Sequence, residues 1–284
     1  MPELPEVETI KTDLKGKITG KKITGIEIIG RGSVKSDPEA FEKVLKGNSF
    51  KDIGRLGKIV VFSLEKGSFL LIHLKMTGQL IYEVAGKTIA GGHPEPKVGR
   101  LPNSFTRAYF TFEDGSKLFF NDIRRFGYLK ITDEEEFRKI EGGYGIDALS
   151  PELNEKKLKE IFDKRKKAVK AVLMEQELIA GIGNIYADEI LFEAGVKPQR
   201  PAGSITDEEI KKIREATPKI LRIAVENRGT TFRDYVDANG GTGRHKEFLK
   251  VYGREGEPCG KCKGKIKLTR VAGRSTRYCD ICQK

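Results

Sequence analysis

The chain has 284 residues, which suits two domains and a small third module, and 38% of them are apolar. No apolar run approaches the ~18 residues of a membrane span, and the acidic start lacks the apolar stretch of a signal peptide, so we expect a cytoplasmic protein without membrane contact. The 53 lysines and arginines exceed the 41 aspartates and glutamates, and the formal net charge of +12 favours an anionic partner.

The first half of the sequence predicts two short helices and a set of strands. Apolar residues recur at helical spacing within residues 5–18 and again within residues 38–47. Runs of β-branched and aromatic residues, separated by short turn signals, predict strands at residues 22–30, 58–64, 68–76, 79–84, 107–112, 117–122 and 126–131. Short strands with tight turns predict an antiparallel sandwich or barrel against which the first helix packs. A loop rich in glycine and proline is expected at residues 85–104.

The second half has a different pattern, because its apolar residues recur with the helical period of 3.6. This period predicts helices at residues 133–140, 154–176, 184–195 and 206–229. A linker that contains glycine and proline at residues 142–153 separates the two halves and predicts a domain boundary.

Basic residues gather in two places. Residues 242–284 contain 12 basic against 4 acidic residues, and a second run of lysines covers residues 156–170. Clusters of this kind are typical of proteins that bind the phosphate backbone of a nucleic acid. A solvated, lysine-rich surface explains one such run by itself, but two runs and the global excess predict nucleic acid as the partner.

All four cysteines lie in the last 26 residues, in the pattern C-x2-C-x16-C-x2-C: Cys259, Cys262, Cys279 and Cys282. This spacing is typical of a structural site in which four thiolates hold one Zn²⁺ ion. Disulfides are the alternative, but nothing in the sequence marks a secreted protein. The segment between the pairs predicts a β-hairpin with its turn near Gly273. Three arginines on this hairpin indicate contact with a phosphate backbone: Arg270, Arg274 and Arg277.

A glycine-rich turn, "GIGN" at residues 181–184, joins two predicted helices. A dinucleotide-binding loop would follow a strand, whereas the segment before this turn has a helical pattern. We expect Asn184 to cap the second helix, whose free backbone N–H groups would then face a phosphate. A plain structural turn explains the glycines equally well.

Four motifs occur together in order: "PELPEVET" at residues 2–9, "NDIRRFG" at residues 121–127, "AGIGNIYADEIL" at residues 180–191, and the cysteine pairs. With them the chain resembles, from residue 2 to residue 284, the bacterial formamidopyrimidine-DNA glycosylases, also called 8-oxoguanine DNA glycosylase/AP lyases. The resemblance implies a multi-domain α+β fold with an N-terminal antiparallel β-sandwich and flanking helices, a helix-two-turn-helix domain and a zinc-ribbon hairpin. We expect a catalytic domain at residues 1–141, a linker at 142–153, a helical DNA-binding domain at 154–240 and a zinc finger at 246–284.

The resemblance also implies a bifunctional enzyme, which removes oxidised purines from duplex DNA and then cuts the strand by β,δ-elimination. In that family the initiator methionine is removed, so that Pro2 becomes a secondary amine that attacks C1′ of the deoxyribose, and Glu3 acts as general acid on the ring oxygen. An α-amine has a pKa near ~8, so part of it is unprotonated at neutral pH. Lys58 matches the lysine that contacts the damaged base and assists β-elimination, and Arg274 matches the proposed assistant of δ-elimination.

Further residues carry over to contacts with DNA. By resemblance Met76, Arg124 and Phe126 fill the space left by the extruded base, and Arg124 bonds to the orphaned cytosine. The residues that grip phosphates around the kinked site are Arg165, Asn184 and Arg274. The implied partners are one structural Zn²⁺ ion and double-stranded DNA that contains oxidised bases or abasic sites, and we expect a monomer.

The sequence departs from the family pattern, among other places at Phe105 and Ile123, and alternative functions stay open. Phe105 stands where the family usually has a histidine that contacts the DNA backbone, and Ile123 stands where it commonly has proline. Endonuclease VIII, the sister class for oxidised pyrimidines, usually starts Pro-Glu-Gly-Pro-Glu, so Leu4 favours the purine enzyme. The other alternative is a non-catalytic zinc-ribbon DNA-binding protein, and the complete catalytic set argues against it.

Overall fold

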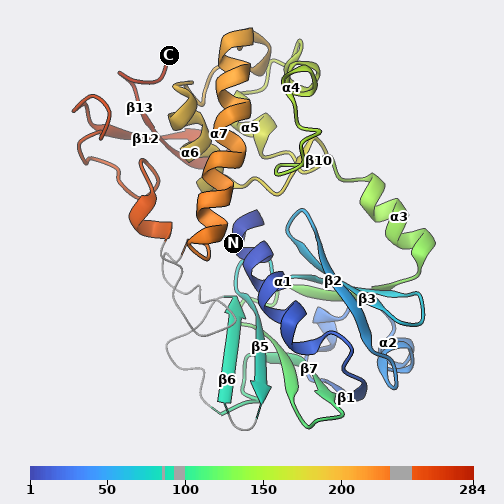
Figure 1. Cartoon of the computed structure of the whole chain (residues 1–284). Coiled ribbons are helices and arrows are strands. Elements are labelled where there is room, and N and C mark those ends of the chain that lie inside the picture. The colour runs from blue at the N-terminus through green and yellow to red at the C-terminus, as the bar shows by residue number, and fades with distance from the viewer. Residues whose placement is uncertain (85–86, 93–99, 231–244) are drawn as a thin grey trace. The chain divides into compact units, whose positions relative to one another are not determined.

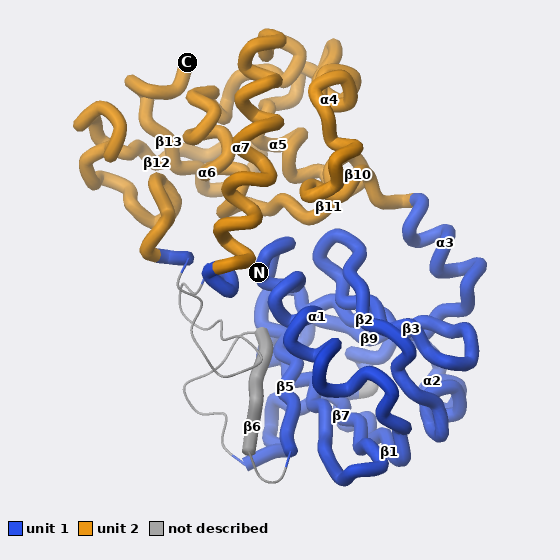
Figure 2. The backbone as a smooth tube through the Cα atoms, viewed as in Figure 1, with its two compact units in different colours: residues 1–142, 227–246 blue, residues 143–226, 247–284 orange. Residues whose placement is uncertain are grey.

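The computed structural model describes residues 1–84, 87–92, 100–230 and 245–284, with the backbone alone for Arg31 and for residues 87–92. Contacts divide the chain into two compact units (Figure 2). Unit 1 comprises residues 1–142 and 227–246, and unit 2 comprises residues 143–226 and 247–284. The helices within residues 143–226 and the cysteine-bearing hairpin therefore share unit 2. The division at residues 141, 154, 240 and 246 stays a prediction. Part of the predicted loop at residues 85–104 lies outside the described residues.

Unit 1 is built on two antiparallel sheets (Figure 1). The first sheet, with strand order β1-β7-β8-β5-β6, comprises β1 (Ile23–Ile28), β5 (Gly78–Val84), β6 (Lys87–Gly92), β7 (Thr106–Phe112) and β8 (Lys117–Asp122). The second, with order β2-β3-β4-β9, comprises β2 (Phe50–Leu56), β3 (Ile59–Leu64), β4 (Phe69–His73) and β9 (Tyr128–Thr132). One continuous buried cluster contains Phe110 and Phe120 of the first sheet together with Phe62 and Ile72 of the second. The two sheets therefore share one apolar core, which confirms the predicted sandwich.

Helix α1 (Leu4–Ile18) begins with Pro5 in its first turn and packs against β2 and β3. Its stripe of Val7, Ile10 and Leu14 is completely buried, as the helical spacing predicts. The helix does not end at Gly16, as glycine in that position suggests, but runs on to bury Ile18. The remaining helical elements of the N-terminal part are η1 (Arg31–Ser33), α2 (Pro38–Leu45) and α3 (Glu134–Gly142).

Two strands of unit 1 were not predicted. Strand β2 has the sequence "FKDIGRL", in which charged residues and Gly54 conceal the strand pattern, and it forms because it pairs with β3 along its length. Strand β6 lies inside the segment predicted as a loop, and it pairs with β5 from Val84↔Lys87 to Gln79↔Gly92. In both cases pairing with a neighbouring strand decides the conformation, while local composition favours a turn.

Unit 2 contains helices α4 (Glu155–Phe162), α5 (Val169–Leu173), α6 (Asn184–Ala194) and α7 (Asp207–Glu226), together with η2 (Ala202–Ser204). The short helix η3 (His245–Phe248) spans the boundary between the two units at residue 246. Helices α6 and α7 pack side by side (Figure 1). The short parallel strands β10 (Ile146–Asp147) and β11 (Ile179–Ala180) pair with each other. The last strands, β12 (Ile266–Val271) and β13 (Arg274–Cys279), form the predicted hairpin, in which Ala272 and Gly273 make the turn with positive φ.

The single helix predicted at residues 154–176 is wrong, because the chain leaves the helix after Phe162 and starts α5 only at Val169. Lys164 takes a positive φ of 53°, and the Val169 N–H then donates to Arg200 O at 2.7 Å. Residues 163–168, in the middle of the lysine-rich run, thus leave the helix, and the chain there pairs with the segment before η2. None of the helices in the described ranges is long and apolar enough to cross a membrane.

Candidate active site and zinc centre

The N-terminus of α1 is fixed by its own first turn. The side chain of Glu6 accepts the Glu3 N–H at 2.8 Å, and its other oxygen accepts the Thr230 N–H at 2.8 Å. Pro2 and Glu3 are buried, whereas Met1 is 48% exposed. Removal of Met1 would therefore leave Pro2 as the terminal residue of a rigid helix start. Glu6 was not singled out in the sequence, although glutamate three residues after a helix cap is a known signal of such a turn.

Lys58 lies in the turn that joins β2 to β3, next to Gly57, whose φ is 55°. Its side chain is 94% buried, since only 6% is exposed. Helix α1 packs on both of these strands. The structure thus places Pro2, Glu3 and Lys58 in one unit, at the start of α1 and in the turn of the strands that α1 covers.

His73, at the end of β4, is a further candidate that the sequence analysis missed. It is opposite Ile59 in the sheet, and its Nδ1 accepts the Lys75 N–H at 3.0 Å. Burial, and after it the charges of Lys75 and Lys58, together lower the pKa of His73 to about 3. The imidazole is therefore neutral at physiological pH and lies close to two cations. The one signal in the sequence that could have indicated His73 as a site residue is its position at the end of a predicted strand.

Met76, Arg124 and Phe126 lie together in space, although two different loops carry them. The Arg124 Nη1 atom is 2.9 Å from Met76 Sδ, and the Arg124 guanidinium lies 4.7 Å above the ring centre of Phe126. Met76 is 41% exposed and Phe126 54% exposed. The three side chains therefore form one exposed cluster, which is unusual for methionine and phenylalanine.

Asp122 shapes the turn that carries Arg124 and Phe126. Its carboxylate is completely buried, bonds to Thr77 Oγ1, and accepts the N–H groups of Arg124 at 3.2 Å and of Gly127 at 2.6 Å. A side chain at Gly127 would collide with Phe120 and with the Asp122 carboxylate, so this glycine is required by close packing. Asp122 is a second residue that the sequence analysis did not single out.

In unit 2 the glycine turn differs from the expectation. Gly183 occupies the N-cap position of α6, and Asn184 is the first helical residue, so Asn184 does not cap the helix. Its amide nitrogen donates to Ser275 O at 3.1 Å and to the Tyr252 hydroxyl at 3.4 Å. Asn184 thereby joins α6 to the β-hairpin at the residue that follows Arg274.

The four arginines of unit 2 that the sequence analysis singled out differ in their exposure. Arg270 and Arg274 are exposed on the hairpin. Arg277, in contrast, is 14% exposed, bonds to Glu255 at 3.3 Å and stacks on the Tyr252 ring at 4.3 Å, so its guanidinium is held by the protein. Arg165 is half-buried and donates through Nε to Ile161 O at 2.5 Å.

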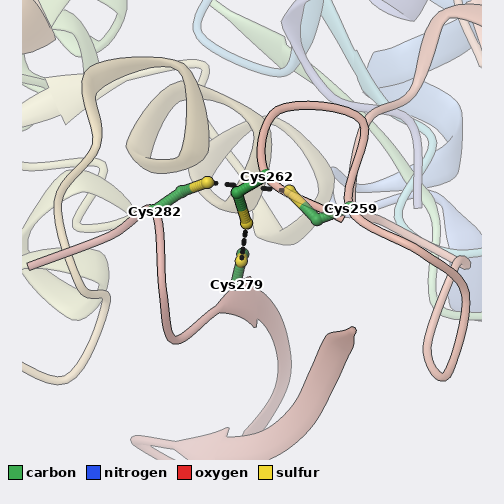
Figure 3. A group of neighbouring side chains, drawn as sticks. All are labelled: Cys259, Cys262, Cys279 and Cys282. Atoms are coloured by element: carbon green, nitrogen blue, oxygen red, sulfur yellow. Dashed lines mark hydrogen bonds between the residues drawn. The ribbon is translucent and has the colours of Figure 1, made fainter. Parts of the chain in front are cut away.

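The four cysteines form a compact cluster, with all four Sγ atoms within 4.8 Å of one another (Figure 3). The Cys259–Cys282 and Cys262–Cys279 Sγ distances are 3.8 and 3.5 Å. Four sulfurs bound tetrahedrally at about 2.3 Å from Zn²⁺ would be about 3.8 Å apart, whereas a disulfide would require about 2.05 Å. The cluster therefore fits a zinc ion and excludes the disulfide alternative.

The environment of Cys259 favours its thiolate form, whereas burial raises the pKa of the Cys279 and Cys282 thiols. Burial raises the pKa of the Cys259 thiol, but N–H groups of Lys261 and Cys262 outweigh it and lower the pKa to about 7. Cys259 and Cys279 pack with Phe192 of α6 and with Val251 and Ile266 in one buried cluster. A structural zinc ion at these four residues would therefore fix the hairpin to helix α6.

Comparison with known proteins agrees with this geometry. Family models match residues 1–129 as a formamidopyrimidine-DNA glycosylase N-terminal domain, residues 144–236 as the H2TH domain of the same glycosylase, and residues 256–284 as a zinc finger found in FPG and IleRS. Formamidopyrimidine-DNA glycosylases of Pelotomaculum thermopropionicum and Carboxydothermus hydrogenoformans are 38% and 40% identical to the chain. Both alignments cover the whole chain, with 99% and 100% of the respective relative.

Solved structures give the same result. A Lactococcus lactis Fpg variant in complex with DNA that contains Fapy-dG matches with a TM-score of 0.88 and 30% identity, over 100% of both chains. The complex of L. lactis Fpg with DNA that contains an abasic site matches with a TM-score of 0.87 and 30% identity, over 99% of both chains. The sandwich, the H2TH helices and the four-cysteine zinc site define a DNA-repair glycosylase. The chain belongs to the formamidopyrimidine-DNA glycosylase family.

Proposed function

We propose that the protein is a bifunctional enzyme, which excises oxidised purines such as 8-oxoguanine and formamidopyrimidines from duplex DNA and then cleaves the strand at the resulting abasic site. The observation that carries this proposal is the anchored start of α1, where Glu6 holds the Glu3 N–H and Pro2 is the residue exposed by removal of Met1. Its substrate would be chromosomal DNA in a bacterial cytoplasm.

In the proposed reaction the Pro2 nitrogen attacks C1′ of the damaged nucleotide while the bond from C1′ to the base breaks. The departing base keeps the electron pair of that bond and takes up the proton that the Pro2 amine loses. Glu3 protonates the sugar ring oxygen, which opens the ring and leaves an iminium ion on Pro2. A secondary amine cannot lose a further proton to give a neutral imine, so the adduct keeps its positive charge and acidifies the 2′ hydrogen. Loss of that proton expels the 3′ phosphate, and a second elimination expels the 5′ phosphate.

The other predicted residues take supporting roles in this proposal. Lys58 contacts the damaged base and assists the first elimination, and Arg274, exposed on the hairpin, assists the second. Met76, Arg124 and Phe126 enter the space left by the extruded nucleotide, for which an exposed cluster of one cation and two apolar side chains is suited. Arg165, Asn184 and Arg274 bind phosphates of the DNA backbone.

Borohydride trapping tests the proposal directly, because it reduces an iminium to a stable covalent adduct. The substrate is a duplex with 8-oxoguanine opposite cytosine, and wild type is compared with Pro2→Gly. We expect a covalent band in wild type and a much weaker band in the variant. A duplex with thymine glycol distinguishes endonuclease VIII-like specificity, since that activity would trap on this duplex preferentially. Binding without trapping on either duplex would show a DNA-binding protein without lyase chemistry.

A further inference from the structure

Arg55 connects the two elements that carry the proposed catalytic residues. It lies near the end of β2, and its side chain is 8% exposed. Its Nε atom donates to Glu8 Oε2 of helix α1 at 3.0 Å. Its Nη1 atom donates to the carbonyl oxygen of Gly57 at 3.0 Å. One guanidinium therefore bonds to the helix and to the turn at the same time.

Both ends of this contact lie close to the proposed chemistry. The Gly57 carbonyl belongs to the peptide group that continues into Lys58, so the bond from Arg55 fixes the orientation of that peptide group. The turn has only two residues between the paired Leu56 and Ile59, and Gly57 takes a φ of 55° within it. At the other end Glu8 follows Glu3 by five residues, about 7.5 Å along the helix at 1.5 Å per residue.

The ion pair is held in place from both sides. Glu8 also bonds to Lys11 of the same helix, and its side chain is 21% exposed. Although burial raises the pKa of Glu8, the bonds from Lys11 and Arg55 outweigh it and keep the pKa below its usual value. The carboxylate is therefore ionised at neutral pH. A planar guanidinium can serve two acceptors in fixed directions, which an ammonium on a flexible stem cannot do.

We propose that Arg55 is a positioning residue of the reaction, which holds the peptide of Lys58 at a fixed place relative to the helix that carries Pro2 and Glu3. The inference rests on the proposed function. Because small displacements of a reacting group slow a reaction strongly, loss of this contact should slow the formation of the covalent adduct more than it weakens DNA binding.

The structure offers a matched control on the same two elements. Lys15 of α1 and Asp52 of β2 form an ion pair at 2.6 Å, with side chains 51% and 52% exposed. This pair joins the helix to the same strand but lies further from the turn. Asp52→Asn therefore removes a bond between α1 and β2 without touching the peptide of Lys58.

The experiment measures single-turnover excision of 8-oxoguanine, borohydride trapping, and the Kd for a duplex with a tetrahydrofuran abasic-site analogue. We expect Arg55→Met to slow excision at least about tenfold while the Kd changes less than about twofold. Arg55→Lys should slow excision nearly as much, and Asp52→Asn should resemble wild type. Glu8→Gln keeps the shape of the side chain and should also slow excision, as Arg55→Met does. It replaces Arg55→Met as the test if that variant folds poorly.

A second experiment, in a protein that already lacks the Lys58 side-chain amine, distinguishes a positioning role of Arg55 from a general loss of stability. If Arg55 acts through Lys58, then Arg55→Met should slow excision very little in a protein that already carries Lys58→Met. The inference would be overturned if Arg55→Met and Lys58→Met slowed excision by independent factors. It would also be overturned if the Arg55 and Glu8 variants excised as fast as Asp52→Asn. Either result would leave the proposed function intact. A wild type that forms no trapped adduct would overturn both.

Discussion

The Lys170 Nζ and Asp188 Oδ1 atoms lie 2.7 Å apart, and both side chains are completely buried. Lys170 also donates to Ser275 O at 3.1 Å and to Thr276 Oγ1 at 2.8 Å, while the other Asp188 oxygen accepts the Arg277 N–H at 2.9 Å. The pair thus connects α5 and α6 to three consecutive residues of β13. These residues follow Arg274 directly in the same strand, so the buried pair holds the part of β13 that lies next to this arginine.

The first prediction concerns the stability of this pair. Asp188→Asn would leave the Lys170 ammonium buried without a counterion, and we expect it to destabilise unit 2 by about 3–5 kcal/mol. The measurement is urea unfolding at pH 8, above the value of about 7 to which burial raises the pKa of Asp188 despite the opposing charge of Lys170.

The matched control is Asp207→Asn, which removes the exposed Lys159–Asp207 pair and should not change the unfolding midpoint. Replacement of both buried partners, by Lys170→Met with Asp188→Leu, should recover much of the lost stability, because no buried charge remains. A double variant as unstable as Asp188→Asn would contradict this account of the pair.

The contact between Lys170 and Asp188 also illustrates what the sequence can predict. The helix that contains Asp188 is evident from its apolar period, and the hairpin is evident from the cysteine spacing and Gly273. That a lysine within a basic run would be buried is not evident, because the run as a whole has the composition of a solvated surface. The backbone turn at Lys164 separates Lys170 from that run, and tertiary pairing with residues 200–202 creates the turn.

The same limit applies to the candidate active site. The positions of Pro2, Glu3 and the cysteines follow from motifs, and the clustering of the four thiols confirms the zinc site. Asp122, His73 and Arg55 were missed, because each meets a partner from a distant part of the chain. Asp122 bonds to Thr77, Arg55 bonds to Glu8, and His73 lies opposite Ile59 in the sheet. Such contacts depend on the register of the strands, and local composition does not determine register.

The second prediction concerns pH, and it follows from the buried imidazole of His73. In the unfolded chain its pKa is about 6.5, whereas burial first, then the charges of Lys75 and Lys58, lower it to about 3 in the folded protein. Above pH 6.5 neither state binds this proton, so the contribution to stability is fully present. As the pH falls from 6.5 toward 3, the unfolded chain takes up the proton and the folded chain does not, so stability is lost.

We therefore expect the free energy of unfolding of wild type to fall, relative to that of His73→Gln, by up to about 1.4 kcal/mol for each pH unit between pH 6 and pH 4. Urea unfolding of both proteins at a series of pH values measures the difference, and pH 8 provides the reference. Comparison of wild type with His245→Gln should show the same loss of stability at low pH, but over a shorter pH range, since burial lowers the pKa of His245 only to about 4. A difference that does not vary with pH would contradict the assignment.

The third prediction concerns the zinc ion. One Zn²⁺ per chain is expected by elemental analysis, and Cys279→Ser should abolish tight binding, because Cys279 is a fully buried member of the cluster. Chelation should also loosen the segment that Glu189 holds. This carboxylate accepts the N–H groups of Lys250, Val251 and Tyr252 at 2.8 to 2.9 Å, next to the apolar cluster that contains the cysteines.

Hydrogen exchange provides the readout for this loosening. Exchange at Val251 and Tyr252 should accelerate when a chelator removes the metal, while the amides of the β3–β4 ladder in unit 1, such as Val60 opposite Ile72, serve as the internal reference. Unchanged exchange at Val251 and Tyr252 in the metal-free protein would show that the hairpin is held without zinc.

The fourth prediction concerns the exposed cluster of Met76, Arg124 and Phe126. If these side chains fill the space of an extruded base, Phe126→Ala should slow excision from duplex DNA by about tenfold or more, since extrusion costs a few kcal/mol and tenfold corresponds to about 1.4 kcal/mol. Phe126 is 54% exposed, so the substitution should change the free energy of unfolding by less than about 0.5 kcal/mol.

Two comparisons make this result specific. Cleavage of an abasic site in single-stranded DNA requires no extrusion and should remain at the wild-type rate. Ile29→Ala, which removes another exposed apolar side chain from the same unit, should leave both rates unchanged. Because the Arg124 guanidinium stacks on Phe126 at 4.7 Å, Arg124→Ala combined with Phe126→Ala should slow excision less than the product of the two separate effects. Equal slowing on duplex and single-stranded substrates would instead place Phe126 in the chemical step and contradict its role as a void-filling residue.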